Sequence, residues 1–330
     1  MSLRVFVPLW LSKIATRTPR HRICYMKTII LLLVVVTQVV CAQAPHPLEG
    51  RWDLTVNWNG KQVPSWLEVR HSGREALVGR FCFAFGSARP VAEVKWDNGR
   101  FNFGIPPQWE PGTRHMEFTG TLEGEKLSGT MVYTDGKTSS FTGVRAPALV
   151  RTAPPVWGEP IALIGKDLSG WKPDGDRNQW QLEDGILRSP QSGVNIRTVQ
   201  QFTDFKLHVE FRYPKGSNSG VYLRGRYEVQ INDALGLEPW DINYSGIYGF
   251  LPPNRNMARP AGEWQTYDIT LVGRTVTVVA NGVTVISEQI IPGITGGAID
   301  SREGEPGPIL LQGDHGPIEF RNMIITPARP

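Results

Sequence analysis

Residues 220–233 carry three side chains that could act together on a ligand rich in hydroxyl groups. Successive side chains of a β-strand point to opposite faces, and here Arg224, Glu228 and Gln230 share one parity while apolar residues fill the other. A glutamate can move a proton, an arginine can stabilise an oxyanion and a glutamine can hydrogen-bond a hydroxyl. The pattern also fits a solvated outer sheet face on which Arg224 and Glu228 pair, and it leaves both interpretations open. Gly225 could divide the stretch into two strands joined by a turn.

Histidine could complete an acid–base site, and two histidines lie near the polar strands. These are His208 and His315, the second within the turn Asp314-His315-Gly316. A histidine-based metal site would need Glu228, Asp233 or Asp314, and no ligand spacing in the sequence supports it. We therefore expect no metal and no cofactor, with a divalent cation as the remaining alternative. The sequence contains no Gly-x-Ser-x-Gly elbow, phosphate-binding glycine-rich loop or His-Glu-x-x-His motif.

The elements that must position these residues are strands. In residues 205–213 apolar side chains alternate with His208, Glu210 and Arg212, and Asn281-Gly282 is a strong hairpin signal. Strands of this number, separated by long polar loops, predict a jelly-roll sandwich of two sheets over residues 161–330. One sheet of such a sandwich often curves, and its concave face can bind a ligand.

Residues 45–145 are predicted to form a separate all-β domain, a small antiparallel barrel or sandwich. Short alternating runs follow one another there, split by turn signals such as Asp97-Asn98-Gly99 and Asp135-Gly136. Four of its tryptophans could be sugar platforms, although core packing or turn anchoring is favoured for most of them. They are Trp58, Trp66, Trp96 and Trp109. The domain shows no catalytic constellation, and the proline-rich residues 146–160 that follow it are predicted to be a linker.

Residues 1–44 are predicted to be a leader that holds a secretory signal peptide. Met26-Lys27 provides a positive start, residues 29–36 are apolar throughout, and Ala42-Gln43-Ala44 is a small-x-small cleavage site. We expect translation to start at Met26 and the mature protein to be periplasmic or extracellular, without a transmembrane helix. A lipoprotein anchored through Cys41 is the less favoured alternative, because a bulky valine precedes this cysteine.

The leader also distorts the charge of the chain. The formal net charge is +4, from 35 Lys and Arg against 31 Asp and Glu, but six basic residues and no acidic residue precede residue 45. The remainder has 29 basic and 31 acidic residues, a net charge of −2, so the basic isoelectric point is no evidence for a nucleic-acid partner. Cys82 would be the one cysteine left, which excludes a disulfide framework and favours a buried hydrophobic role.

Seven segments between about residues 160 and 327 occur in an order that resembles one known family. They are residues 165–171, 180–187, 220–231, 245–249, 262–267 ahead of the Asn281-Gly282 hairpin, 311–316 and 320–322. In this order they are similar to the 3-keto-disaccharide hydrolase family, also called the 3-keto-glycoside hydrolase or lyase family. Two features differ from the family: Gln265 occupies a position where an asparagine is commoner, and the segment of residues 293–306 is longer than expected for the family.

The resemblance implies a concanavalin-like jelly roll, related to laminin-G folds, and a pyranose substrate already oxidised at C3 by a separate sugar 3-dehydrogenase. The ketone acidifies the C2 proton, so a base can remove it and expel the C1 group, after which water adds to the enone. Glu228 would be the general base and Arg224 would stabilise the enolate oxygen, while His315 would protonate the leaving oxygen or exchange roles with Glu228. The substrate-binding residues would be Gln230, Tyr248, Glu210, Asp233, Gln312 and Asp314.

Two other functions remain open, because jelly rolls support many activities. A carbohydrate-binding module without turnover would rely more on exposed tryptophans than on Arg224, Glu228 and His315. A conventional retaining glycosidase would use Glu210 and Glu228 as its carboxylates and would cleave an unoxidised glycoside.

Overall fold

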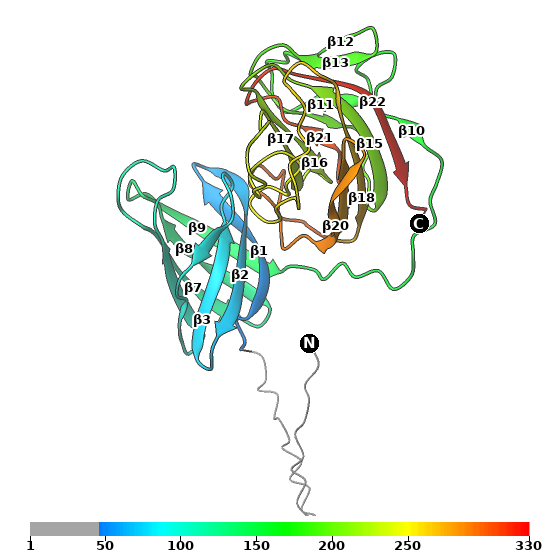
Figure 1. Cartoon of the computed structure of the whole chain (residues 1–330). Coiled ribbons are helices and arrows are strands. Elements are labelled where there is room, and N and C mark those ends of the chain that lie inside the picture. The colour runs from blue at the N-terminus through cyan, green and yellow to red at the C-terminus, as the bar shows by residue number, and fades with distance from the viewer. Residues whose placement is uncertain (1–45, 330) are drawn as a thin grey trace, which may run out of the picture. The chain divides into compact units, whose positions relative to one another are not determined.

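The computed structural model describes residues 46–329, which form strands and connecting loops without a helix (Figure 1). Residues 45–330 make up one compact unit. The leader, with the expected start at Met26, the signal peptide and Cys41, lies outside the described residues. Within residues 46–329 there is no helix with the length and apolar character needed to cross a membrane. The all-β class predicted from the alternating runs is confirmed.

Nine strands form one antiparallel sheet, called the N-terminal sheet, in the order β4-β3-β2-β1-β9-β8-β7-β6-β5. Their bounds are β1 (Gly50–Trp58), β2 (Lys61–Ser72), β3 (Ala76–Cys82), β4 (Arg89–Val91), β5 (Lys95–Asp97), β6 (Arg100–Ile105), β7 (Met116–Glu123), β8 (Lys126–Val132) and β9 (Thr138–Arg145). Because β4 lies against β6, the sheet curls around an apolar core that includes Trp52, Phe81 and Phe118. Asn98 and Gly99 both have positive φ, as the two-residue turn between β5 and β6 requires.

The remaining strands form two antiparallel sheets, together called the C-terminal sandwich. The larger sheet has the order β12-β13-β22-β15-β18-β19-β20 with β10 paired to β22, and the smaller has the order β11-β14-β21-β16-β17. Their bounds are β10 (Ile161–Ala162), β11 (Trp171–Pro173), β12 (Gln181–Glu183), β13 (Ile186–Ser189), β14 (Ile196–Thr198), β15 (Phe205–Arg212), β16 (Asn218–Leu223), β17 (Tyr227–Asn232), β18 (Gln265–Val272), β19 (Thr275–Ala280), β20 (Val283–Ile290), β21 (Leu310–Leu311) and β22 (Ile318–Pro327). Leu207 and Val209 of β15 share one core with Val229 and Ile231 of β17, which confirms the predicted sandwich.

The N-terminal sheet reaches the core of the sandwich through β2 and β3. Trp66 and Cys82, at facing positions of these strands, belong to the sandwich core. Trp66 packs edge-on against Phe250, with ring centroids 5.2 Å apart, and its ring fills the space beside Gly293. Cys82 is buried with a free thiol, as predicted, and burial raises its pKa to about 12. The two sets of strands are therefore joined by packing as well as by the proline-rich residues 146–160.

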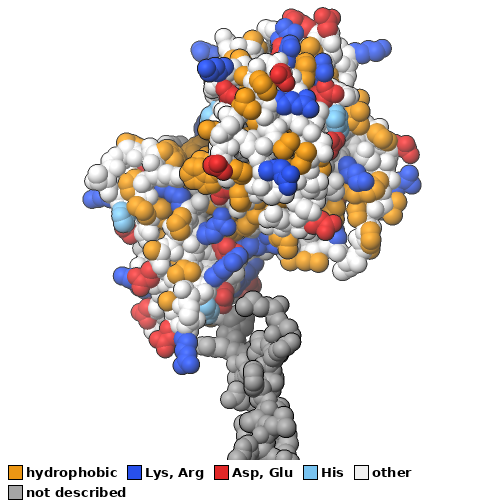
Figure 2. All heavy atoms as spheres, in the orientation of Figure 1, with side chains coloured by type: hydrophobic (Ala, Val, Ile, Leu, Met, Phe, Trp, Pro, Cys, Tyr) orange, Lys and Arg blue, Asp and Glu red, His pale blue; other side chains and the backbone are white. Residues whose placement is uncertain are grey.

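Charged side chains of both signs occur together on the face of the molecule that Figure 2 draws, interspersed with apolar ones.

Candidate active site

A pocket of about 450 Å³ lies over the smaller sheet of the sandwich, and β17 supplies its central acidic side chain. Glu228 and Gln230 line this pocket, whereas Tyr227, Val229 and Ile231 lie in the apolar core. This is the division of faces that the alternation predicts for β17. Further polar lining residues are Asn195, Asn218, Tyr222, Tyr248, Gln312, Asp314 and His315.

The position of Glu228 depends on a glycine in the neighbouring strand. Gly220 of β16 pairs with Gln230 of β17, two residues along the ladder from the pair that Tyr222 makes with Glu228. A Cβ atom on Gly220 would lie 2.2 Å from Oε1 of Glu228 and 2.8 Å from its Cγ. The glutamate side chain therefore occupies the space that the glycine leaves empty, where only 3% of the residue is exposed.

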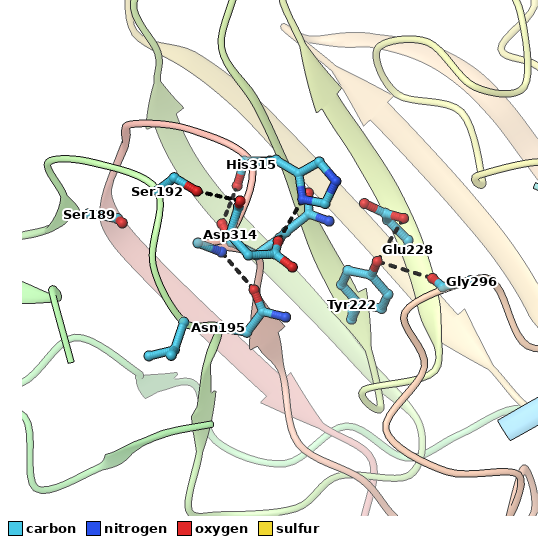
Figure 3. Close-up of polar contacts among 12 residues, drawn as sticks. Ser189, Ser192, Asn195, Tyr222, Glu228, Gly296, Asp314 and His315 are labelled. Atoms are coloured by element: carbon cyan, nitrogen blue, oxygen red, sulfur yellow. Dashed lines mark hydrogen bonds and ion pairs between the residues drawn. The ribbon is translucent and has the colours of Figure 1, made fainter. Parts of the chain in front are cut away.

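Tyr222 holds the carboxyl group of Glu228. Its hydroxyl oxygen lies 2.8 Å from Oε2 of Glu228 and 3.1 Å from the carbonyl oxygen of Gly296 (Figure 3). A hydroxyl has one proton to donate, so it cannot donate to both acceptors at once. Donation to the carboxyl group of Glu228 therefore leaves the carbonyl oxygen of Gly296 without this proton.

Burial favours the protonated form of Glu228. Desolvation by burial raises its pKa to about 8, and the charge of Asp314 acts in the same direction. The hydrogen bond from Tyr222 and the nearby His315 oppose this rise. A carboxyl group with such a pKa can both give and take a proton near neutral pH, as general acid–base chemistry requires.

His315 lies beside Glu228 as a second proton-carrying group. Its Nδ1 is 2.6 Å from Oδ1 of Asp314, and Figure 3 shows this contact facing the same hollow as the carboxyl group of Glu228. The hydrogen bond to Asp314 raises the pKa of His315, and the charge of Glu228 adds to the effect. The two charges therefore act on each other's group: His315 lowers the pKa of Glu228, and Glu228 raises the pKa of His315.

A family model described as "3-keto-alpha-glucoside-1,2-lyase-like domain" matches residues 159–326, half of the chain. The chain belongs to this family. The match covers the C-terminal sandwich, with Glu228 and His315, and leaves the N-terminal sheet outside. The resemblance that the sequence motifs indicated over about residues 160–327 is thereby confirmed.

The chain is also similar to individual proteins of two organisms. A 3-keto-disaccharide hydrolase of Bacteroides thetaiotaomicron is 26% identical over 165 residues, a match that covers 38% of this chain and 57% of that protein. A protein of Parabacteroides distasonis, provisionally described as a glycosyl hydrolase, is 32% identical, with 53% of this chain and 92% of that chain covered and a TM-score of 0.44. A second protein of that organism with the same description is 25% identical, with 51% and 98% covered and a TM-score of 0.41.

Most of the predicted site residues of the lyase-like domain lie in this one pocket. They are Glu228, Gln230, Tyr248, Gln312, Asp314 and His315. Gln312 is 7% exposed, and within residues 46–329 its Oε1 atom has no hydrogen-bond donor in reach. A buried acceptor that lines a pocket and lacks a donor is well placed to receive a hydrogen bond from a substrate hydroxyl.

Arg224 does not lie in the pocket, contrary to the sequence prediction. It belongs to the turn between β16 and β17, where Arg224 and Gly225 have φ values of 52° and 66°. The turn breaks the parity that relates Arg224 to Glu228, and the guanidinium is fully buried elsewhere. There it donates to the Tyr227 hydroxyl at 2.9 Å and to the carbonyl oxygen of Gly273 at 3.0 Å. Arg224 is therefore placed to hold the turn rather than an enolate.

Asp233 and Glu210 also lie outside the pocket. Asp233 follows β17, and its Oδ2 accepts a hydrogen bond from the backbone nitrogen of Gly216 at 2.9 Å, which closes a turn. Glu210 lies on β15 of the larger sheet and accepts hydrogen bonds from Arg321 and Asn322 at 2.7 and 2.9 Å. The carboxylate pair of a retaining glycosidase, Glu210 with Glu228, is thus divided between two sheets and is not assembled.

Several lining residues were missed by the sequence analysis. Tyr222 has the same parity as Glu228 within residues 220–233. A hairpin turn at Gly225 would therefore have predicted that the two residues lie opposite each other on neighbouring strands. Residues 296–299 come from the segment that is longer than the family pattern, and this length was the signal available. Asn195 and Asn218 carried no distinguishing signal, because loop asparagines are common in any β protein.

Within residues 46–329 no three His, Cys, Asp or Glu side chains gather in a way that could hold a metal ion. The absence of a metal and of a cofactor from the reaction therefore stays a prediction.

Proposed function

We propose that this protein is an exported enzyme that cleaves 3-keto-glycosides or 3-keto-disaccharides. The observation that carries the proposal is the buried carboxyl group of Glu228 beside His315, in a pocket lined by amide and hydroxyl groups. Membership of the lyase-like family and the hydrolase among its relatives support the choice of substrate. Amide and hydroxyl groups suit a sugar, and two proton-carrying side chains in one pocket, Glu228 and His315, suit chemistry that moves a proton on carbon.

The proposed reaction begins at C2 of a pyranose whose C3 is a ketone. The unprotonated member of the Glu228–His315 pair takes the C2 proton, and the electron pair moves to the ketone oxygen. As the enolate collapses, the C1–oxygen bond breaks, and the protonated member of the pair gives its proton to the departing oxygen. Water then adds across the C1–C2 double bond, so one glycoside and one water become a 3-keto sugar and a free aglycone.

Neutral donors replace Arg224 in the proposed stabilisation of the enolate. Asn195 and Tyr248 line the pocket and carry an amide and a hydroxyl donor. Desolvation raises the pKa of Tyr248 to about 12, so this side chain keeps its proton and acts as a donor throughout the neutral range. A preorganised neutral donor in a partly dry pocket can stabilise an oxyanion strongly without being charged itself.

The proposed substrate places the enzyme after a sugar 3-dehydrogenase, because the C3 ketone must exist before the C2 proton becomes acidic. Export through the signal peptide is part of the proposal, with anchoring through Cys41 as the alternative. N-terminal sequencing of the secreted product should give a chain that begins after Ala44. Loss of membrane association in Cys41→Ala would show the lipoprotein instead.

The decisive experiment compares a glucoside with its 3-keto derivative. We expect release of the aglycone from the 3-keto compound alone, and loss of this release in His315→Ala. Release from the unoxidised glucoside would indicate an ordinary glycosidase. Binding of both compounds without release would indicate a carbohydrate-binding module.

A further inference from the structure

The N-terminal sheet, which lies outside the family match, supplies one wall of the pocket. Gln62, Val63 and Pro64 at the start of β2 and residues 84–86 after β3 line the same cavity as Glu228. The polar groups of the pocket come mainly from the sandwich, whereas the N-terminal wall is largely apolar. A half-exposed phenylalanine, Phe85, lies in this wall with 51% of its surface accessible.

The loop that carries Phe85 is fixed against the floor of the site by close backbone contacts. The backbone nitrogen of Gly297 donates to the carbonyl oxygen of Ala84 at 2.8 Å. A Cβ atom on Gly296 would lie 2.3 Å from the carbonyl oxygen of Gly86, so no side chain larger than glycine fits there without a shift. Gly296 is also the residue whose carbonyl faces the Tyr222 hydroxyl. The loop is therefore connected to Glu228 through only two intervening residues.

Aromatic contacts hold the Phe85 ring in place. Its ring stands edge-on to Phe83 at 6.0 Å and to Trp109 at 6.3 Å between centroids. Gly86, with φ of +77°, leaves room for the Trp109 ring, because a Cβ atom there would lie 2.5 Å from Nε1 of Trp109. A preorganised aromatic ring loses little conformational entropy when a ligand packs against it.

We propose that Phe85, backed by Trp109, forms the binding surface for the leaving group of the substrate. The inference rests on the proposed function and adds a specificity-determining residue to it. The 3-keto ring needs the hydrogen-bonding side chains of the sandwich, among them Gln230 and Gln312, and its C2 must face the Glu228–His315 pair. The group attached to C1 then extends toward the apolar N-terminal wall. The structure thus favours aglycones with a ring, either an aromatic ring or a second pyranose, over small alkyl groups.

The test compares two 3-keto-glucosides that differ in the aglycone, one phenyl and one methyl. We expect Phe85→Ala to lower kcat/KM for the phenyl compound about tenfold, mainly through KM, and to leave the methyl compound unchanged. Phe85→Trp should keep the preference for phenyl. The matched control is Val144→Ala, since Val144 lies on β9 of the same sheet, is also 51% exposed and does not line the pocket. Equal effects on both substrates, or no effect on either, would overturn the assignment of Phe85.

A binding measurement separates this inference from the proposed reaction. In the Glu228→Gln background, calorimetry should show tighter binding of the phenyl than of the methyl compound, and Phe85→Ala should abolish the difference. If the wild-type enzyme turns over neither compound while this difference is found, the reaction is wrong and the subsite stands. If the wild-type enzyme turns over the substrates but the two compounds bind equally tightly to Glu228→Gln, with or without Phe85→Ala, the subsite is wrong and the reaction stands.

Discussion

The pocket face of the smaller sheet and the outer face of the larger sheet each present a glutamate from the polar parity of an alternating strand. Glu228 on β17 is buried, and desolvation raises its pKa to about 8. Glu210 on β15 is more exposed, and hydrogen bonds from Asn322 and Arg321 lower its pKa. Glu228 is covered by loops and has one tyrosine partner, whereas Glu210 is paired with an arginine and an asparagine of the adjacent strand β22. Burial, rather than position on a polar strand face, therefore gives Glu228 and Glu210 opposite pKa shifts.

The largest expected effect is on the turnover rate and comes from a substitution of Glu228. Removing a general acid–base group costs about 10²–10⁴ in rate, so Glu228→Gln should reduce turnover of a 3-keto-glucoside by that factor. Glu210→Gln is the matched control and should stay within about threefold of wild type, because Glu210 lies on the other sheet. Steady-state kinetics with both variants checks this. Near-full activity in Glu228→Gln together with loss in His315→Ala would assign the base role to histidine alone.

A smaller effect should follow from moving Glu228 without changing it. Gly220→Ala places a methyl group where the carboxyl group now lies, and a displacement of about 1 Å can cost roughly 10²-fold in rate. Gly165→Ala is the control, since a Cβ atom there meets nothing within 4 Å. Circular dichroism should show both variants folded. Full activity of folded Gly220→Ala would mean that the reaction tolerates a displaced carboxyl group.

Tyr222→Phe should change the pKa of Glu228 and leave that of Glu210 unaffected. The hydrogen bond from Tyr222 lowers the pKa of Glu228, so its removal raises that pKa further. The limb of the pH–rate profile that belongs to the carboxyl group should move to higher pH, with a loss of roughly several-fold at pH 7. Tyr213→Phe removes a buried hydroxyl outside the pocket and should leave the profile unchanged. An unshifted profile in Tyr222→Phe would separate Tyr222 from the titration.

The smallest expected effect is on stability, where the two glutamates should act with opposite signs. The folded protein keeps the Glu228 proton up to a pH of about 8, whereas the unfolded chain loses it near the ordinary value. The stability from protonated Glu228 is therefore fully present in acid and is lost as the pH rises toward 8. Glu228→Gln should melt a few degrees above wild type at about pH 8, with the difference vanishing below about pH 4.

Glu210 should show the reverse dependence. Its pKa is lowered in the folded protein, so its stabilisation is present above the unfolded pKa and is lost as the pH falls through the folded one. Glu210→Gln should melt about one or two degrees below wild type at pH 7, and the two melting temperatures should converge in acid. Calorimetric melting curves at several pH values check both variants. The same sign for both substitutions would contradict the assigned surroundings.

The family motifs, the alternation and the hairpin signals in the sequence determined the fold class and much of the site. Alternation placed Glu228 and Gln230 on one face of β17 because side chains of a strand point to opposite faces in turn. The order of the short motifs indicated the family. The residues within each motif are neighbours along the chain, so each motif can be recognised without knowledge of long-range contacts. The turn residues Asn98-Gly99 and Asn281-Gly282 likewise act locally, through their tolerance of positive φ.

Only the tertiary structure decided which polar residues meet and what covers them. Arg224 does not share the sheet face of Glu228, because the turn at Gly225 interrupts the alternation of the strand. Glu210 lies apart from Glu228, because β15 belongs to the other sheet. The approach of Phe85 to the pocket joins residues more than 140 positions from Glu228 in the chain, through contacts with glycines of the segment 293–297. Such contacts depend on backbone surfaces fitting closely after folding, and no local pattern in a sequence encodes that fit.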